Sequence, residues 1–257
     1  MTRSVHIAAL LIVAGCQTRE APPPQPTPTP TPAPARDAAV DAAPSPDADT
    51  TTVRQEMQAH FTLVVDVQRA ITRGHLDAAR ESARALLAYD APDIEGGAPF
   101  VADMKQAATA LVAAKDLPTA GTLAAVLGRT CSRCHEATNA VIAFAWEPQP
   151  EPDPSLRVQM QRHQWAAARL WEGVVGPSDE MWNQGVDGLA AADIDALVAA
   201  RGIDRGDTKA LAKHVHELAV RAKQTTDPGA RAQLYGDLLS TCAGCHQLLR
   251  PAPVPDP

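Results

Sequence analysis

Two segments of this 257-residue chain begin and end alike, and this repeat limits the possible folds more than any other feature. Near the start of each segment, Met57–His60 (MQAH) corresponds to Met160–His163 (MQRH) at an offset of 103. Near the end, Thr130–Cys131 corresponds to Thr241–Cys242 at an offset of 111. One insertion between the second and third helices of the later segment accounts for the difference. The repeat predicts a duplicated unit.

Both segments have the composition of helical bundles. The chain is 45% hydrophobic but only 4% aromatic, and alanine, which favours helix, supplies much of the apolar content. Ser178 and Asp227, which precedes a proline, are expected helix N-caps. The expected helices are 53–73, 76–89, 98–115 and 118–144, then 156–174, 179–200, 207–224 and 228–249. Four helices joined by brief loops form an up-and-down bundle, so we expect an all-α fold of two tandem four-helix bundles.

The last helix of each bundle carries the same five-residue motif. Cys131–His135 (CSRCH) and Cys242–His246 (CAGCH) both have the spacing of c-type haem attachment. Two thiols three residues apart on a helix can reach both vinyl groups of one haem, and the histidine that follows can be the proximal iron ligand. We therefore predict two covalent haem c groups. The residues expected to hold them are Cys131, Cys134, His135, Cys242, Cys245 and His246.

Three other interpretations of the cysteine pairs are weaker. Zinc-ribbon sites need two pairs close together in the sequence, whereas these pairs are 111 residues apart. Redox-active pairs occur beside βαβ patterns, which this sequence lacks. Structural disulfides would be possible in an exported protein, but they do not explain the histidine that follows both pairs.

The position of the motif indicates a family. Each motif lies at the end of a four-helix segment, and this arrangement resembles the class II cytochromes, the cytochrome c-prime group, in which the haem sits inside a four-helix bundle. The resemblance covers about 53–144 and 156–249 in architecture, although its only sharp residue match is the attachment motif and the two segments are shorter than is usual. It implies either an open iron that binds small gases or a six-coordinate iron that carries electrons.

The sixth iron ligand has two candidates in each segment. The first helix holds a methionine and a histidine three residues apart, which places both on one face: Met57 with His60, and Met160 with His163. The histidines are the favoured distal ligands because imidazole binds ferric iron well. The methionines are the alternative and would raise the reduction potential. An open iron is the third possibility.

The N-terminus resembles a bacterial lipoprotein signal. Residues 1–15 hold Arg3 and then an apolar run too short to span a bilayer, and Cys16 follows small residues as in a lipobox. Lipidation of Cys16 would anchor the protein to a membrane surface without a transmembrane helix. Gln17, in place of an aspartate, indicates the outer membrane by enterobacterial sorting. An ordinary cleaved signal is the alternative.

Proline clusters divide the rest of the chain. Residues 16–52 are rich in proline, alanine and threonine and are expected to form an extended tether. The expected haem domains are 53–146 and 156–250, joined by a proline-rich linker at 147–155.

These features predict an electron carrier rather than an enzyme. The formal net charge is −7 and no basic run indicates a nucleic-acid partner, so the expected partners are redox proteins. The expected location is the periplasmic face of the bacterial envelope. The alternatives are a gas-binding or gas-sensing protein with five-coordinate haem, and a di-haem peroxidase.

Overall fold

The described part of the chain is helical. The computed structural model describes residues 48–192, 194, 198–199 and 206–249. These residues form helices and loops, and they contain no β-strand. The helices of the first half are α1 (Ala48–Thr72), α2 (Leu76–Ala88), α3 (Ala98–Ala113) and α4 (Leu117–Ala137). Those of the second half are α5 (Leu156–Val175), α6 (Asp179–Ala190), α8 (Gly206–Lys223) and α9 (Pro228–Leu248). The predicted all-α class is therefore confirmed.

The two halves have the same pattern of contacts. In the first half α2 packs on α1 and α3, and α4 packs on α3 and α1. In the second half α6 packs on α5 and α8, and α9 packs on α8 and α5. Ser178 and Asp227 cap α6 and α9 as expected: each side chain accepts a hydrogen bond from a backbone N–H of the first turn. Asp116, which corresponds to Asp227 at the offset of 111, caps α4 in the same way.

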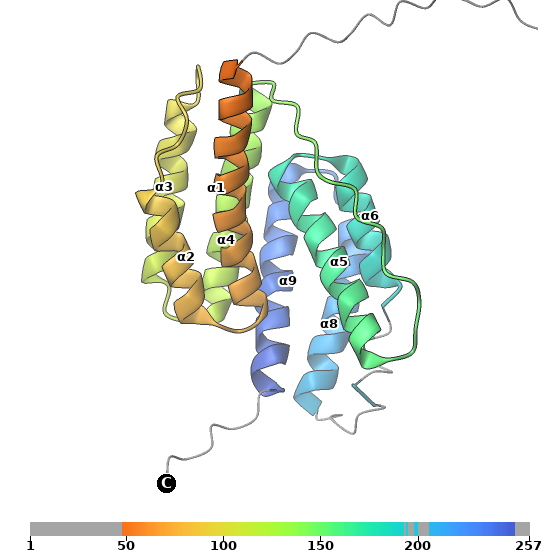
Figure 1. Cartoon of the computed structure of the whole chain (residues 1–257). Coiled ribbons are helices and arrows are strands. Elements are labelled where there is room, and N and C mark those ends of the chain that lie inside the picture. The colour runs from red at the N-terminus through yellow and green to blue at the C-terminus, as the bar shows by residue number, and fades with distance from the viewer. Residues whose placement is uncertain (1–47, 193, 195–197, 200–205, 250–257) are drawn as a thin grey trace, which may run out of the picture. The chain divides into compact units, whose positions relative to one another are not determined.

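The most extensive contact between helices joins the two halves, through α4 and α9 (Figure 1). The helices run antiparallel, because Gly121 of α4 meets Ser240 of α9 whereas Ala125 meets Gly236. Ala125 and Gly236 are also equivalent positions of the repeat. A β-carbon added to Gly121 would lie 2.7 Å from Ser240 Oγ and 3.2 Å from the carbonyl oxygen of Gly236, so the absence of a side chain lets the backbones approach.

Three predicted boundaries differ from the structure. Helix α1 begins at Ala48, inside the segment expected to be tether, and α6 ends at Ala190 rather than at 200. Helix α4 ends at Ala137 rather than at 144, and Asn139 beyond it has a φ of 51°, outside the right-handed helical region. The segment after α4 instead packs against α5: the indole Nε1 of Trp165 donates to the Glu147 carbonyl at 2.9 Å.

The predicted membrane anchor lies outside the described residues. These exclude the signal segment 1–15, the lipidated Cys16 and most of the tether. Among the helices that the structure does describe, none is both long and apolar enough to cross a bilayer.

Candidate haem sites

The two motifs lie on the last turns of α4 and α9. Within the described chain the four cysteines are free thiols, and burial raises the pKa of Cys131 and Cys242 to about 12, with a smaller contribution from the second cysteine of each pair. Burial also raises the pKa of Cys134 and Cys245. Redox-active pairs have lowered thiol pKa values, so this environment differs from that of a disulfide oxidoreductase.

In the first half, the first-helix histidine is buried within electrostatic range of the motif histidine. His60 is buried, with 7% of its surface exposed, and burial is the main reason that its pKa falls to about 4. The second cause is the charge of His135, which therefore lies near it. The His60 ring stacks on Tyr89, with centroids 5.5 Å apart. The ring nitrogen Nε2 of His60 contacts Met104 on α3: the Met104 Sδ is 2.8 Å away.

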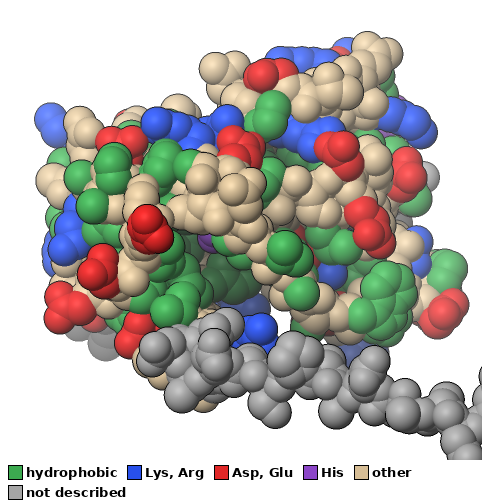
Figure 2. Space-filling model, turned by 90° about the horizontal axis from the view of Figure 1, so that it is seen from above, with side chains coloured by type: hydrophobic (Ala, Val, Ile, Leu, Met, Phe, Trp, Pro, Cys, Tyr) green, Lys and Arg blue, Asp and Glu red, His purple; other side chains and the backbone are tan. Residues whose placement is uncertain are grey.

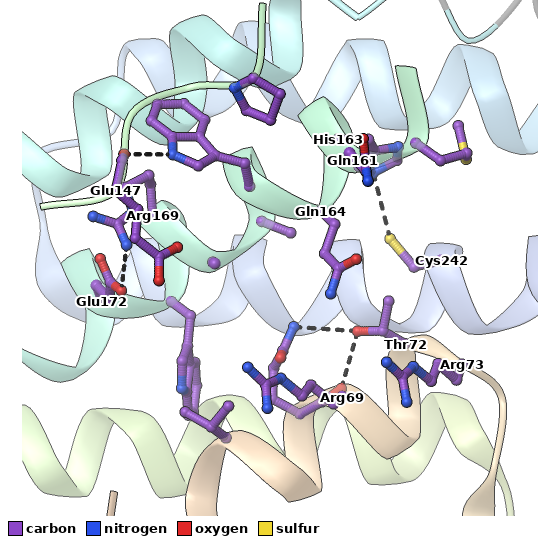
Figure 3. A pocket seen from close by; sticks show the side chains of 18 of the residues that line it. Arg69, Thr72, Arg73, Glu147, Gln161, His163, Gln164, Arg169, Glu172 and Cys242 are labelled. Atoms are coloured by element: carbon purple, nitrogen blue, oxygen red, sulfur yellow. Dashed lines mark hydrogen bonds and ion pairs between the residues drawn. The ribbon is translucent and has the colours of Figure 1, made fainter. Parts of the chain in front are cut away.

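The second half repeats this pairing. Burial lowers the pKa of His163 to about 4, and the charge of His246 is again the second cause. His163 Nε2 lies 3.9 Å from Cys242 Sγ (Figure 3). The structure therefore brings each predicted distal histidine to the attachment motif of its own half.

Each motif histidine also bonds to the opposite half. His135 Nδ1 lies 2.9 Å from the carbonyl oxygen of Val175, the last residue of α5. His246 Nδ1 lies 2.5 Å from the carbonyl oxygen of Thr72, the last residue of α1. Thr72 and Val175 are equivalent positions at the offset of 103, so the two hydrogen bonds are reciprocal.

These hydrogen bonds determine the tautomers. A carbonyl oxygen only accepts, so the proton of each neutral imidazole is on Nδ1 and the lone pair is on Nε2. Histidines that bind metals are commonly held in this way, with the second nitrogen donating to a carbonyl. Both motif histidines are therefore oriented to offer Nε2 as a ligand.

A cavity of about 1060 Å³ adjoins the second motif (Figure 3). Its walls include Cys242, Cys245 and His246 from α9, and the apolar side chains of several other elements. These apolar residues are Phe61, Val65, Met160, Trp171, Leu211 and Val215. Cofactor sites are apolar cavities of this scale with a few convergent polar groups, and both thiols and both histidines of this half reach the same space. The residues present thus fit a covalently bound haem.

The cavity also reaches a buried ion pair that sequence reasoning did not single out. Arg169, with its side chain 2% exposed, bonds to Glu172 at 2.7 Å, and one carboxylate oxygen of Glu172 has no hydrogen-bond partner. Burial raises the pKa of Glu172 to about 7, opposed by Arg169 and assisted by Glu147. The equivalent pair of the first half, Asp66 with Arg69, has the charges exchanged and is about half exposed.

Trp171 lies between the two motifs. It lines the cavity beside Cys242 and stacks on Tyr235 of α9, with ring centroids 5.2 Å apart. It also packs on α4 one turn before Cys131, because a β-carbon at Gly128 would lie 2.6 Å from its ring. This aromatic pair fills space between the two halves.

The structure also locates the alternative distal ligands. Met57 is half-buried, and Met160 is half-buried and lines the cavity. Met104 was missed, although it contacts His60 directly. Its only signal in the sequence was a methionine on an apolar helix face, which by itself indicates core packing.

Comparison with known protein families, curated proteins and solved structures finds no match to this chain.

Proposed function

We propose that this chain is a lipid-anchored di-haem c-type cytochrome that carries electrons between redox partners of the bacterial envelope. Each half would be a four-helix haem domain of the class II kind. Haem, once attached, supplies an iron that gains and loses one electron. At each site the chain would supply the thiols that attach the haem, two histidines that hold its iron, and the surrounding apolar helices.

One observation carries this proposal: each motif histidine lies close enough to the histidine of its own first helix for their charges to interact. His135 is near His60, and His246 is near His163. Two histidines that both hold the iron would leave it no free position, which suits electron transfer and not the binding of an added ligand. The same pairing in both halves also speaks against a peroxidase, which needs one open iron.

The two sites are separate, but helices α1 and α5 each contribute to both. Helix α1 carries His60 at the first site and reaches His246 of the second site through the Thr72 carbonyl. Twelve residues separate His60 from Thr72, which corresponds to roughly 18 Å along the helix. Helix α5 joins the sites in the same way through His163 and Val175. Helices α1 and α5 therefore fix the spacing of the two candidate sites, which would suit sequential electron transfer between them.

The surface fits a protein partner better than a nucleic acid. Lys and Arg side chains are interspersed with Asp and Glu over the face shown in Figure 2, and the net charge is −7. A polyanion would need a continuous basic surface. The lipid anchor at Cys16 would keep the protein near membrane-bound redox partners, in the proposed periplasmic location.

The optical spectrum of the haem-loaded protein tests this function. We expect low-spin α and β bands after reduction, and no spectral change when carbon monoxide is added. Carbon monoxide bound at both haems would replace the proposal with gas sensing. Binding at one haem only would favour the peroxidase.

Removing His163 should open the second iron. In His163→Ala we expect a partly high-spin spectrum and about one carbon monoxide bound per reduced chain, because the imidazole is lost from that cavity. His214→Ala is a matched control, since the side chain of His214 on α8 is 44% exposed and pairs with Glu217. An unchanged spectrum in His163→Ala would rule out His163 as the ligand and favour Met160.

A further inference from the structure

The first site holds a donor atom in contact with its first-helix histidine, at a position where the second site has an apolar residue. Met104 and His60 are both buried, with 4% and 7% of their surfaces exposed, and Met104 Sδ lies 2.8 Å from His60 Nε2. A thioether sulfur and an imidazole nitrogen, both able to bind iron, are thus in contact at the first site.

The repeat places a valine where the first half has Met104. Four buried residues of α3 match four buried residues of α8 at the offset of 111. They are Met104, Ala107, Ala108 and Leu111 in α3, and Val215, Leu218, Ala219 and Ala222 in α8. Val215 lines the cavity together with His163 but carries no donor atom. His60 therefore has a competing donor beside it, and His163 has none at this position.

We propose that Met104 competes with His60 for the distal position of the first haem, one binding at a time, and that the share bound by Met104 gives this haem the higher reduction potential of the two. The inference rests on the proposed di-haem function. A thioether ligand raises a haem potential and a second imidazole leaves it lower. Two identical sites would exchange electrons without direction, whereas a difference between them favours the second haem as donor and the first as acceptor.

Exchanging the two residues tests the inference on the full, haem-loaded chain. In a redox titration followed by absorbance we expect two separate midpoint potentials. Met104→Val should lower the upper potential towards the lower one, and Val215→Met should raise the lower potential. Leu111→Val, at a buried position two turns further along α3, is the matched control and should leave both potentials unchanged. Equal potentials in the unchanged protein, or no shift in Met104→Val, would overturn the inference.

A second pair of variants gives an independent result. His60→Ala should remain low-spin and exclude carbon monoxide at the first haem, because Met104 is still present. The double variant His60→Ala, Met104→Val should bind carbon monoxide there. A high-spin first haem in His60→Ala would contradict the role of Met104. Haem content measured on every sample keeps the two proposals apart: a chain without covalent haem contradicts the function itself, whereas two haems of equal potential contradict only this inference.

Discussion

Alanine at both Cys242 and Cys245 should reduce the covalent haem content from two to one per chain. The two thiols are the only groups at the second site able to form thioether bonds, so haem there would be held by its axial ligands alone. The cavity of about 1060 Å³ would then be liable to lose its haem during purification. Intact mass and the pyridine haemochrome absorbance measure the content.

Two comparisons make this result specific. Alanine at Cys131 and Cys134 should remove the other haem and leave the second one attached. Gly244→Ala changes a spacer position of the second motif, where an added β-carbon would meet only Leu211 at 3.7 Å, an ordinary contact. Both haems should be retained in that variant. Two covalent haems in the Cys242, Cys245 variant would show that the motif does not attach haem.

Valine at Gly121 should cost about 3 kcal/mol of unfolding free energy, through overpacking of the contact between α4 and α9. The first added carbon would already lie 2.7 Å from Ser240 Oγ and 3.1 Å from Ser240 N, and the backbone atom cannot rotate away. Because His135 and His246 each bond to the opposite half, both haem spectra should change together. Denaturant titration followed by circular dichroism measures the loss.

Gly206→Val is the control for this prediction. Among the described residues, no neighbouring atom lies within 4 Å of a β-carbon added at Gly206, so we expect a change of about 0.5 kcal/mol or less. If Gly121→Val were as stable as the unchanged protein, the close packing of α4 on α9 would be wrong.

Local signals in the sequence predicted most of the helices. Ser178 and Asp227 were recognisable as caps because their side chains act on backbone groups two or three residues away. The end of α4 was not recognisable. The apolar residues after it have a composition that favours a longer helix. In the structure, however, Phe144 packs on Phe61, with ring centroids 5.7 Å apart, and the segment packs against α5. Contacts between distant residues decided that boundary.

The candidate sites divide in the same way. The repeat singled out the two motifs, His60 and His163. The structure places each of these two histidines near the motif of its own half. It did not single out Met104, because comparing the halves gives weight to residues that match, and Met104 corresponds to a valine. The acceptors at Thr72 and Val175 are backbone carbonyls, which every residue has, so no sequence pattern marks them. Only the packing of the halves reveals them.

The reciprocal hydrogen bonds are symmetric in space but not in the order in which the chain is made. Val175 follows His135 by 40 residues, so the first motif emerges from the ribosome before the carbonyl that orients its histidine. Thr72 precedes His246 by 174 residues, and the second motif meets an acceptor already made. The first candidate site therefore cannot form completely until α5 of the second half has been made. A chain truncated after residue 155 would hold both thiols and both histidines of that site but would lack the Val175 carbonyl that orients His135.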